Sequence, residues 1–248
     1  MQAAFIIQPR LGSSRLPGNI LLPFYENQTI LDLLIEKLKK VSPNIILATS
    51  HSEENTLLKD VALANNINFF QGSENDVLQR FIDAAEKYNT QKIIRVCSDN
   101  PFLDLDALIQ IVQESQSFTG DYMSFMIDGT PSIKTHFGFW TEYVTLDALK
   151  RVVQSTDSSL YHEHVTNFIY SNPNQFRIKW LPVPTCLHGR QDIRLTIDTK
   201  EDFELLQTLY MSLAAQHVFP KLKDVLVYLE AHPAYYKVMK QQIYKNSK

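Results

Sequence analysis

The chain has 248 residues, of which 44% are hydrophobic and 21% are charged, and its formal net charge is −3. This size allows a substantial core, whereas the near-neutral charge provides no basic surface for a polynucleotide, so nucleic-acid binding is not expected. No stretch approaches a membrane span of roughly 18 apolar residues, and residues 1–7 lack the basic n-region of a signal peptide. Cys97 and Cys186 fit no metal or redox spacing. We therefore expect a cytoplasmic protein in a reducing compartment, with no membrane partner.

Short apolar segments alternate with amphipathic segments along the first half of the chain. The segment after Thr29 has its apolar residues on one helical stripe, and Thr29 itself is a suitable N-cap. Strands are predicted at residues 3–8, 44–50, 67–72 and 92–99, and helices at residues 29–41, 52–66, 74–89 and 104–116. This alternation is typical of βαβ units, and it predicts an α/β fold with a mostly parallel sheet and helices on both faces.

The alternation becomes looser after about residue 118, where the sheet is expected to become mixed. Further strands are predicted at residues 121–126, 136–146, 175–183 and 192–198, and further helices at residues 159–172, 200–215 and 220–232. No repeat or linker interrupts the pattern. We expect a single domain over residues 1–248, with an arm at residues 122–145 that protrudes from it and supports a homodimer.

The loop after the first strand is small, polar and purely cationic. In IIQPRLGSSRLPGN (residues 6–19), glycines permit a close approach of the backbone, and Arg10 and Arg15 add planar forks suited to phosphate oxygens. The loop matches neither the Walker motif nor the dinucleotide-binding turn, which argues against P-loop NTPases and Rossmann dehydrogenases. A polar surface loop whose arginines pair with carboxylates is the alternative interpretation. Ligands of such sheets bind beyond the carboxyl ends of the strands, where this loop lies.

The same loop resembles the first motif of the CMP-sugar synthetases, the cytidylyltransferases that activate acylneuraminate and ketodeoxyoctulosonate. Their SpsF-like spore-coat-polysaccharide branch is the most similar. Five further segments resemble that branch in the same order: GSENDVLQRFIDAA, RVCSDNPFLD, GFWTEYVTLDAL, EHVTNFIYSNPNQFRI and RLTIDTKEDFELL. The resemblance covers most of residues 5–210. It implies a three-layer α/β/α fold like that of the nucleotide-diphospho-sugar transferases, and a dimer.

The resemblance implies that a hydroxyl of a sugar acid attacks the α-phosphorus of CTP, so that pyrophosphate leaves and a CMP-sugar forms for a surface glycan. Mg²⁺ is the expected cofactor, with Asp99 and Asp198 as its ligands, because both follow predicted strands where the family places its metal-binding carboxylates. Each has a structural alternative. Asp99 precedes Asn-Pro and can start a turn, and Asp198 can cap the next helix, although Thr199 can do so equally well.

The resemblance also implies the remaining site residues. The catalytic residues are Arg10, Arg15, Asp99 and Asp198. The nucleotide-binding residues are Gln8, Arg10, Gly12, Ser13, Ser14, Arg15, Ser73, Asp76, Arg80 and Ser98. The residues that bind the sugar are Glu142, His164 and Arg194. A zinc site shared by His162 and His164 is not expected, because residues two apart on a helix do not face each other.

One departure from the family bears on activity. Asn19 stands where the family usually carries a lysine near the triphosphate, and a lost cation there weakens transition-state stabilisation. Lys134 or Arg190 can replace that charge. Alternatively, the triphosphate sits differently, or the protein binds a nucleotide without turning it over. A glycosyltransferase with a D-x-D metal motif at residues 104–106 is a third, less favoured hypothesis, because acidic residues are ordinary at a helix start.

Overall fold

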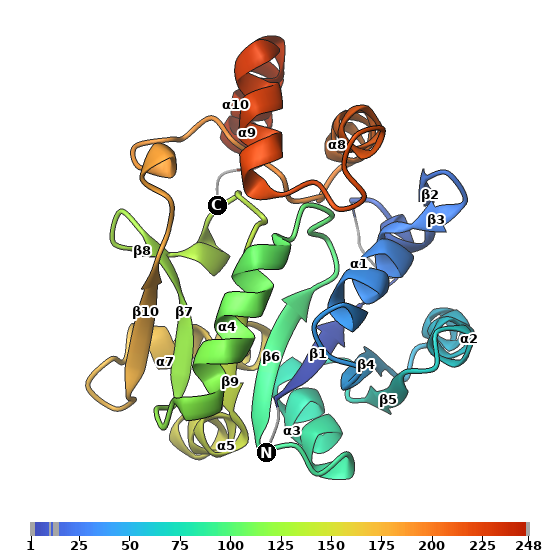
Figure 1. The fold of residues 1–248 in the computed structure, drawn as a ribbon. Coiled ribbons are helices and arrows are strands. Elements are labelled where there is room, and N and C mark those ends of the chain that lie inside the picture. Colours follow the sequence, from blue (N-terminus) through green and yellow to red (C-terminus); the bar gives the residue numbers. More distant parts are fainter. Residues whose placement is uncertain (1–2, 10, 12–14, 247–248) are drawn as a thin grey trace.

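The computed structural model describes residues 3–9, 11 and 15–246 of the chain (Figure 1). The strands are β1 (Ala4–Gln8), β2 (Pro23–Tyr25), β3 (Gln28–Thr29), β4 (Ile45–Ser50), β5 (Asn68–Gly72), β6 (Lys92–Cys97), β7 (Tyr122–Ile127), β8 (Thr130–Pro131), β9 (Glu142–Thr145) and β10 (Ile178–Pro182). The helices are α1 (Ile30–Lys39), α2 (Leu57–Ala64), α3 (Val77–Lys87), α4 (Leu105–Ser117), α5 (Leu146–Ser155), α6 (Ser159–Glu163), α7 (Asn167–Ser171), α8 (Lys200–Ala214), α9 (Leu222–Ala231) and α10 (Ala234–Asn246).

The main sheet of the described residues has eight strands in the order β10-β7-β9-β6-β1-β4-β5, with β8 paired to β7. β1 is a central parallel strand, with Phe5 in register with Ile45 of β4 and Ile94 of β6. β9 runs antiparallel to both β6 and β7, so the sheet becomes mixed late in the chain as predicted. The parallel strands β1, β4, β5 and β6 end on the same edge.

Two apolar cores lie on opposite faces of this sheet. In β1, Phe5 and Ile7 belong to the core that includes α1, α4 and α8, whereas Ala4 and Ile6 belong to the core with α3, α5 and α7. This alternation is the period of two expected for a strand that is buried on both faces. The architecture is therefore the predicted three-layer α/β/α fold. In Figure 1, α8, α9 and α10 cluster at one end of the molecule.

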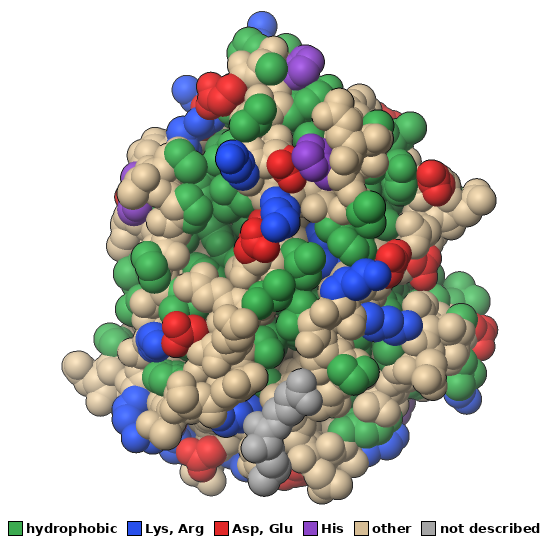
Figure 2. Space-filling view, in the orientation of Figure 1, with side chains coloured by type: hydrophobic (Ala, Val, Ile, Leu, Met, Phe, Trp, Pro, Cys, Tyr) green, Lys and Arg blue, Asp and Glu red, His purple; other side chains and the backbone are tan. Residues whose placement is uncertain are grey.

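The surface is consistent with the near-neutral net charge. Figure 2 shows basic and acidic side chains dispersed over the face that it draws. Among residues 15–246, no helix combines the length and the apolar character that a crossing of the membrane would need.

Two predicted elements are wrong. Residues 192–198, predicted as a strand, are extended but join no strand, because Leu195 and Ile197 donate backbone hydrogen bonds to His136 and Asp99 in loops. Residues 159–172, predicted as one helix, form α6 and α7 with a break between them. Helices α5 and α10 and the hairpin of β2 and β3 are not predicted from the sequence.

Residues 122–145, for which a protruding arm is predicted, contribute strands to the main sheet instead. β7 and β9 from this segment are inner strands of the sheet. Their apolar side chains explain the difference, because Tyr122, Tyr143 and Val144 are fully buried in the two cores. The aromatic stretch around Trp140 packs inside as well, where its ring stacks with Phe125.

Candidate active site

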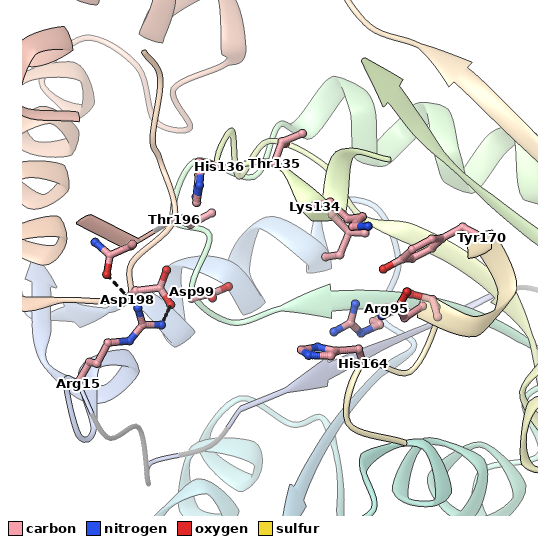
Figure 3. A pocket seen from close by; sticks show the side chains of 14 residues that line it. Arg15, Arg95, Asp99, Lys134, Thr135, His136, His164, Tyr170, Thr196 and Asp198 are labelled. Atoms are coloured by element: carbon pink, nitrogen blue, oxygen red, sulfur yellow. Dashed lines mark hydrogen bonds and ion pairs between the residues drawn. The ribbon is translucent and has the colours of Figure 1, made fainter. Parts of the chain in front are cut away.

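A polar cleft of two connected chambers opens at the edge of the sheet where β1 and β6 end. The larger chamber, about 530 Å³, is lined by Arg15, Arg95, Asp99, Ile133, Lys134, Thr135, His136, His164, Thr166, Asn167, Tyr170, Thr196, Asp198 and Asn246. The smaller chamber, about 260 Å³, is lined by Gln8, Arg15, Asn19, Ile20, Arg95, Cys97, Ser98, Asp99, Glu163, His164, Ile197 and Asp198. Figure 3 shows the larger chamber, with Asp99, Asp198 and Arg15 on one side and Lys134, Tyr170, Arg95 and His164 on the other.

Asp99 and Asp198 meet in this cleft although they are 99 positions apart in the chain. Asp99 follows β6 directly, and Asp198 lies just before α8. The backbone N–H of Ile197 donates to the carbonyl of Asp99 at 3.0 Å, which ties the two segments together. Burial, and then the negative charge of Asp198, raise the pKa of Asp99 to about 6. The two carboxylates therefore form an electrostatically strained pair.

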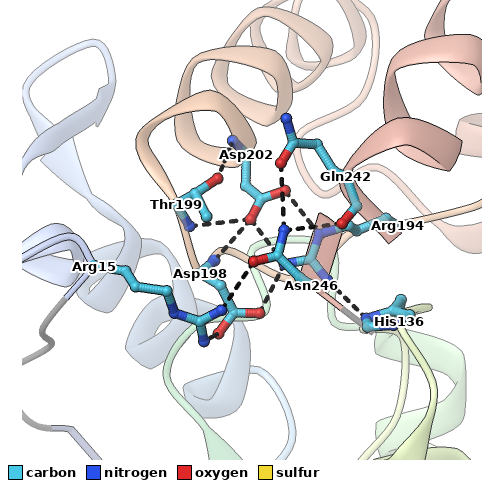
Figure 4. Close-up of polar contacts among 8 residues, drawn as sticks. All are labelled: Arg15, His136, Arg194, Asp198, Thr199, Asp202, Gln242 and Asn246. Atoms are coloured by element: carbon cyan, nitrogen blue, oxygen red, sulfur yellow. Dashed lines mark hydrogen bonds and ion pairs between the residues drawn. The ribbon is translucent and has the colours of Figure 1, made fainter. Parts of the chain in front are cut away.

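Asp198 is held in place by arginines and by the start of α8 (Figure 4). Its two oxygens accept from Arg15 Nη2 at 2.6 Å and from Arg194 Nη2 at 2.7 Å. Thr199, rather than Asp198, caps α8 in a reciprocal capping box with Asp202. The capping alternative for Asp198 is thus wrong, and its carboxylate is available to the cleft.

The helix α10 reaches the same cleft from the far end of the chain. Asn246 on its last turn accepts a hydrogen bond from Arg15 Nη1 at 3.0 Å and lines the larger chamber. Arg15 is 44% exposed, so its contacts with Asp198 and Asn246 are weak enough to be exchanged for a ligand. The loop arginine predicted to bind phosphate is therefore beside the carboxylate pair, in the cleft.

A buried hydrogen-bond network lies behind the wall of the larger chamber that faces Asp99 and Asp198. Arg95 Nη1 donates to Glu142 at 2.7 Å across the β6–β9 pair, where the two residues are in register. Glu142 is 2% exposed and also accepts from the hydroxyls of Tyr122 and Thr166. Thr166 lies at the break between α6 and α7, so these bonds fix the turn that presents His164 to the cleft.

Six predicted site residues line the cleft: Gln8, Arg15, Ser98, Asp99, His164 and Asp198. Two others, Glu142 and Arg194, lie behind the wall and not in it. Arg194 is 1% exposed and committed to Asp202 and Asp198, so the structure gives it no open side for a sugar. Glu142 is occupied by Arg95, Tyr122 and Thr166. Burial thus places both side chains outside the lining of the two chambers, and their role in sugar binding stays a prediction.

Three predicted nucleotide-binding residues lie outside the lining of both chambers. Ser73, Asp76 and Arg80 form a local cluster at the start of α3: Asp76 caps the helix, and Arg80 Nη1 donates to the Ser73 carbonyl at 2.6 Å. Asp76 also bonds to His162 Nδ1 at 2.7 Å. The structure supports a structural role for this cluster. The predicted residues Arg10, Gly12, Ser13 and Ser14 lie outside the described residues.

The D-x-D alternative at residues 104–106 is not supported. Asp104 caps α4, where Oδ1 accepts from the backbone of Ala107 and Oδ2 from that of Leu222. Asp106 is exposed and bonds to Lys221. Both carboxylates are thus explained by the helix start, as expected for acidic residues at that position.

Sequence reasoning missed several residues of the cleft, mainly Arg95, Tyr170 and Asn246. For Arg95 a signal existed, since KIIRVC places one cation inside an otherwise apolar strand. Its partner Glu142 comes from a strand paired antiparallel, which no local pattern reveals. Of the two cations suggested to replace the missing lysine, Lys134 lines the larger chamber, whereas Arg190 pairs with Asp192 and Glu230 outside the lining of both chambers.

Asp99 and Asp198 fit a hard divalent cation. Carboxylate oxygens are the ligands that Mg²⁺ prefers, and it commonly takes one or two of them together with waters and phosphates. Burial, and then the negative charge of Asp198, raise the pKa of Asp99, and a bound cation would favour its charged form. In the described residues no group of three His, Cys, Asp or Glu side chains is placed to hold a metal ion, so phosphates and waters would complete the coordination.

Comparisons with known proteins identify the family of the chain. A family model for cytidylyltransferases matches residues 4–240. The chain belongs to the cytidylyltransferase family. This cytidylyltransferase is 32% identical to the spore coat polysaccharide biosynthesis protein SpsF of Bacillus subtilis, over 92% of this chain and 94% of that protein. The resemblance found in the sequence is therefore confirmed, and the family and fold make the protein a nucleotidyltransferase.

Two solved structures share the fold of this cytidylyltransferase. A cytidylyltransferase from Leptospira borgpetersenii superposes with a TM-score of 0.84 at 28% identity, covering 95% of this chain and 97% of that one. CMP:2-keto-3-deoxy-manno-octonic acid synthetase, solved in complex with CTP, superposes with a TM-score of 0.63 at 14% identity, covering 86% and 99%. At that identity, the second comparison shows the fold alone.

Proposed function

We propose that this cytidylyltransferase transfers CMP from CTP to a sugar acid, with release of pyrophosphate, in the synthesis of a surface polysaccharide. The observation that carries the proposal is the meeting of Arg15, Asp99 and Asp198 in one cleft beside the N-terminal loop. The names of the relatives support it, since one acts in spore coat polysaccharide synthesis and another was solved with CTP. A cytoplasmic homodimer remains part of the proposal.

The smaller chamber is the better place for the triphosphate. It is lined by Gln8 and Ser98 at the ends of β1 and β6, and by Arg15 and Asn19, which follow the predicted phosphate-binding residues Arg10, Gly12, Ser13 and Ser14 in the sequence. In this proposal Arg15 exchanges its contact with Asp198 for a phosphate oxygen. A guanidinium is suited to that exchange because phosphate and carboxylate match its fork equally well.

The larger chamber then receives the acceptor. In-line attack of its hydroxyl on the α-phosphorus requires the two substrates to meet where the chambers join, and Asp99, Asp198 and His164 line both chambers there. Asp99 and Asp198 would hold Mg²⁺, which neutralises charge on the phosphates. Arg15 adds a fixed positive charge next to the same atoms, where charge accumulates as pyrophosphate leaves.

The experiment is to measure pyrophosphate release from CTP and Mg²⁺ with a panel of ulosonic acids. We expect release with at least one acid and its loss in Asp99→Asn. Asp106→Asn is the matched control, because that aspartate is exposed and bonds to Lys221 outside the cleft. Binding of CTP without release for any sugar would contradict the proposal.

A second candidate function is favoured by Asn19, which is 5% exposed in the smaller chamber and carries no charge. A protein that binds the nucleotide without turning it over would fit this residue. Asn19→Lys separates the two candidates. A large gain in turnover from a near-zero value indicates a degenerate enzyme, whereas substantial wild-type turnover with little change indicates that Lys134 or another cation compensates.

A further inference from the structure

The wall of the larger chamber that faces Asp99 and Asp198 is cationic. Figure 3 shows Lys134 and Arg95 on either side of the Tyr170 ring, with His164 nearby. Lys134 is exposed, and its ammonium lies 5.8 Å from the centre of that ring. No carboxylate among the described residues forms an ion pair with it. A cation that lines a substrate cleft and forms no ion pair with the described residues is available to an anionic ligand.

Arg95 is also incompletely satisfied. Its side chain is 11% exposed, and Nη1 is bonded to Glu142. Its Nε is buried and has no hydrogen-bond acceptor among the described residues. Buried polar groups are nearly always paired, so the guanidinium of Arg95 keeps hydrogen-bonding capacity that its protein partners do not use, and its exposed part lines the cleft. Glu142 cannot supply more, because its oxygens already accept from Arg95, Tyr122 and Thr166.

We propose that Arg95 and Lys134 form the subsite for the carboxylate of the acceptor, and that Glu142 is a positioning residue for it. This inference rests on the proposed function, since it names what the larger chamber recognises. Glu142 acts through two contacts: it orients the guanidinium of Arg95, and it holds Thr166 and thus the turn of His164. The subsite takes over the role that the sequence analysis gave to Arg194.

A carboxylate fits this subsite better than a phosphate of the nucleotide does. Figure 3 shows Arg15 beside Asp198, on the side of the larger chamber away from Lys134, and in the proposed function Arg15 contacts the phosphates in the smaller chamber, which it also lines. Arg95 lines both chambers, but Lys134 lines only the larger one, which has about twice the volume of the other, 530 against 260 Å³, as a sugar needs beside a nucleotide. Polar side chains that can form hydrogen bonds with sugar hydroxyls, such as those of Thr135, Asn167 and Tyr170, line the same chamber.

The test measures binding of 3-deoxy-manno-octulosonic acid and N-acetylneuraminic acid, each against its own carboxamide. Titrations contain Mg²⁺ and a CTP analogue with a methylene bridge between the α- and β-phosphates. We expect the wild type to prefer an acid over its amide by about tenfold, a difference of about 1.4 kcal/mol. Lys134→Met and Arg95→Lys should each reduce this preference to about threefold or less, with the affinity for the CTP analogue unchanged within about twofold. Arg95→Lys keeps a charge beside Glu142, so the fold is preserved.

Two further variants complete the design. Lys179→Met is the matched control for Lys134, because Lys179 is half-exposed on β10 and pairs with Glu114. It should leave the preference unchanged. Glu142→Gln should raise the KM for the acid with little change in kcat or in affinity for the CTP analogue, because the analogue does not use Arg95. A general loss of both affinities with a lower melting temperature would show a merely structural role.

The outcomes separate this inference from the proposed function. Equal binding of acid and amide to the wild type, or no binding of either acid, overturns the inference. Loss of affinity for the CTP analogue in Lys134→Met and Arg95→Lys also overturns it, and assigns the two cations to a phosphate. Pyrophosphate release with neutral sugars alone would support a transferase activity and would contradict the carboxylate subsite. A preference for the acid that depends on Arg95, without pyrophosphate release, would support the subsite and would contradict the transferase activity.

Discussion

Asp99→Asn should stabilise the ligand-free protein while it abolishes activity. Burial and the nearby Asp198 raise the pKa of Asp99 from 3.8 to about 6, so the folded state above that pH holds a carboxylate that it disfavours. A shift of about 2 pKa units corresponds to about 3 kcal/mol of unfolding free energy at neutral pH, and asparagine removes this penalty. For a domain of this size the melting temperature should rise by up to about 10 °C.

The assay is thermal and chemical unfolding of wild type, Asp99→Asn and the exposed control Asp106→Asn between about pH 4 and pH 8. A raised carboxyl pKa costs stability as the pH increases from 3.8 to about 6, so the advantage of Asp99→Asn should be largest above about pH 6 and should shrink towards pH 4. The gain from added Mg²⁺ and CTP should be smaller in the variant. A variant that is no more stable than the wild type at pH 8, or an advantage independent of pH, would refute the reasoning.

Three smaller predictions concern the supports of the cleft. Thr199→Ala removes the N-cap of α8 and should cost about 1 kcal/mol in chemical unfolding, together with activity, because Asp198 precedes the cap; an unchanged unfolding midpoint would count against this. Burial lowers the pKa of His162, but the hydrogen bonds to Asp76 and Thr156 outweigh it and raise the pKa above 6.5. His162→Gln should therefore lower the free energy of unfolding more at about pH 5.5, where the imidazole is charged, than at about pH 8.5. Equal losses at the two pH values would contradict this prediction. Gly138→Ala should lower the free energy of unfolding by about 2 kcal/mol or more, because φ is +66° and a Cβ would lie 2.7 Å from the Leu195 carbonyl oxygen. Gly129→Ala, which has open space around it, should lower the free energy of unfolding less in the same assay. The reverse order of the two losses would contradict this explanation.

The elements that were predicted correctly are those with a strong local signal. Thr29 was placed as the cap of α1, and the structure shows it there in a capping box with Asp32. β1 was predicted from a run of apolar residues, which its burial on both faces explains. The spacing of apolar residues predicts a helix or strand correctly where the element buries one regular face or both faces. In such an element, the apolar residues recur with the period of the helix or strand itself.

The wrong elements depend on partners far away in the chain. Ile193, Leu195 and Ile197 alternate as a strand does, and all three are buried, yet their backbone bonds go to loops. The helix predicted at residues 159–172 breaks where Thr166 bonds to Glu142 of another strand. No local pattern can indicate either event, since the competing partner is set by tertiary packing.

The candidate site shows the same division. Asp99 could be selected because it follows a predicted parallel strand whose end faces the ligand edge of the sheet. Asp198 follows an apolar run that joins no strand, and its selection depended on the family resemblance as well. Arg194 lies in the same motif as Asp198, but its position between Asp198 and Asp202 depends on the start of α8. Arg95 and Asn246 enter the cleft only through the register of β6 with β9 and the docking of α10.

The most direct test of the account is a crystal of the protein with CTP and Mn²⁺, in which the ion is located by its anomalous signal. The account predicts an ion within about 2.5 Å of carboxylate oxygens of Asp99 and Asp198, with the triphosphate against Arg15 in the smaller chamber. An ion bound away from both aspartates, or CTP bound outside the cleft, would contradict it.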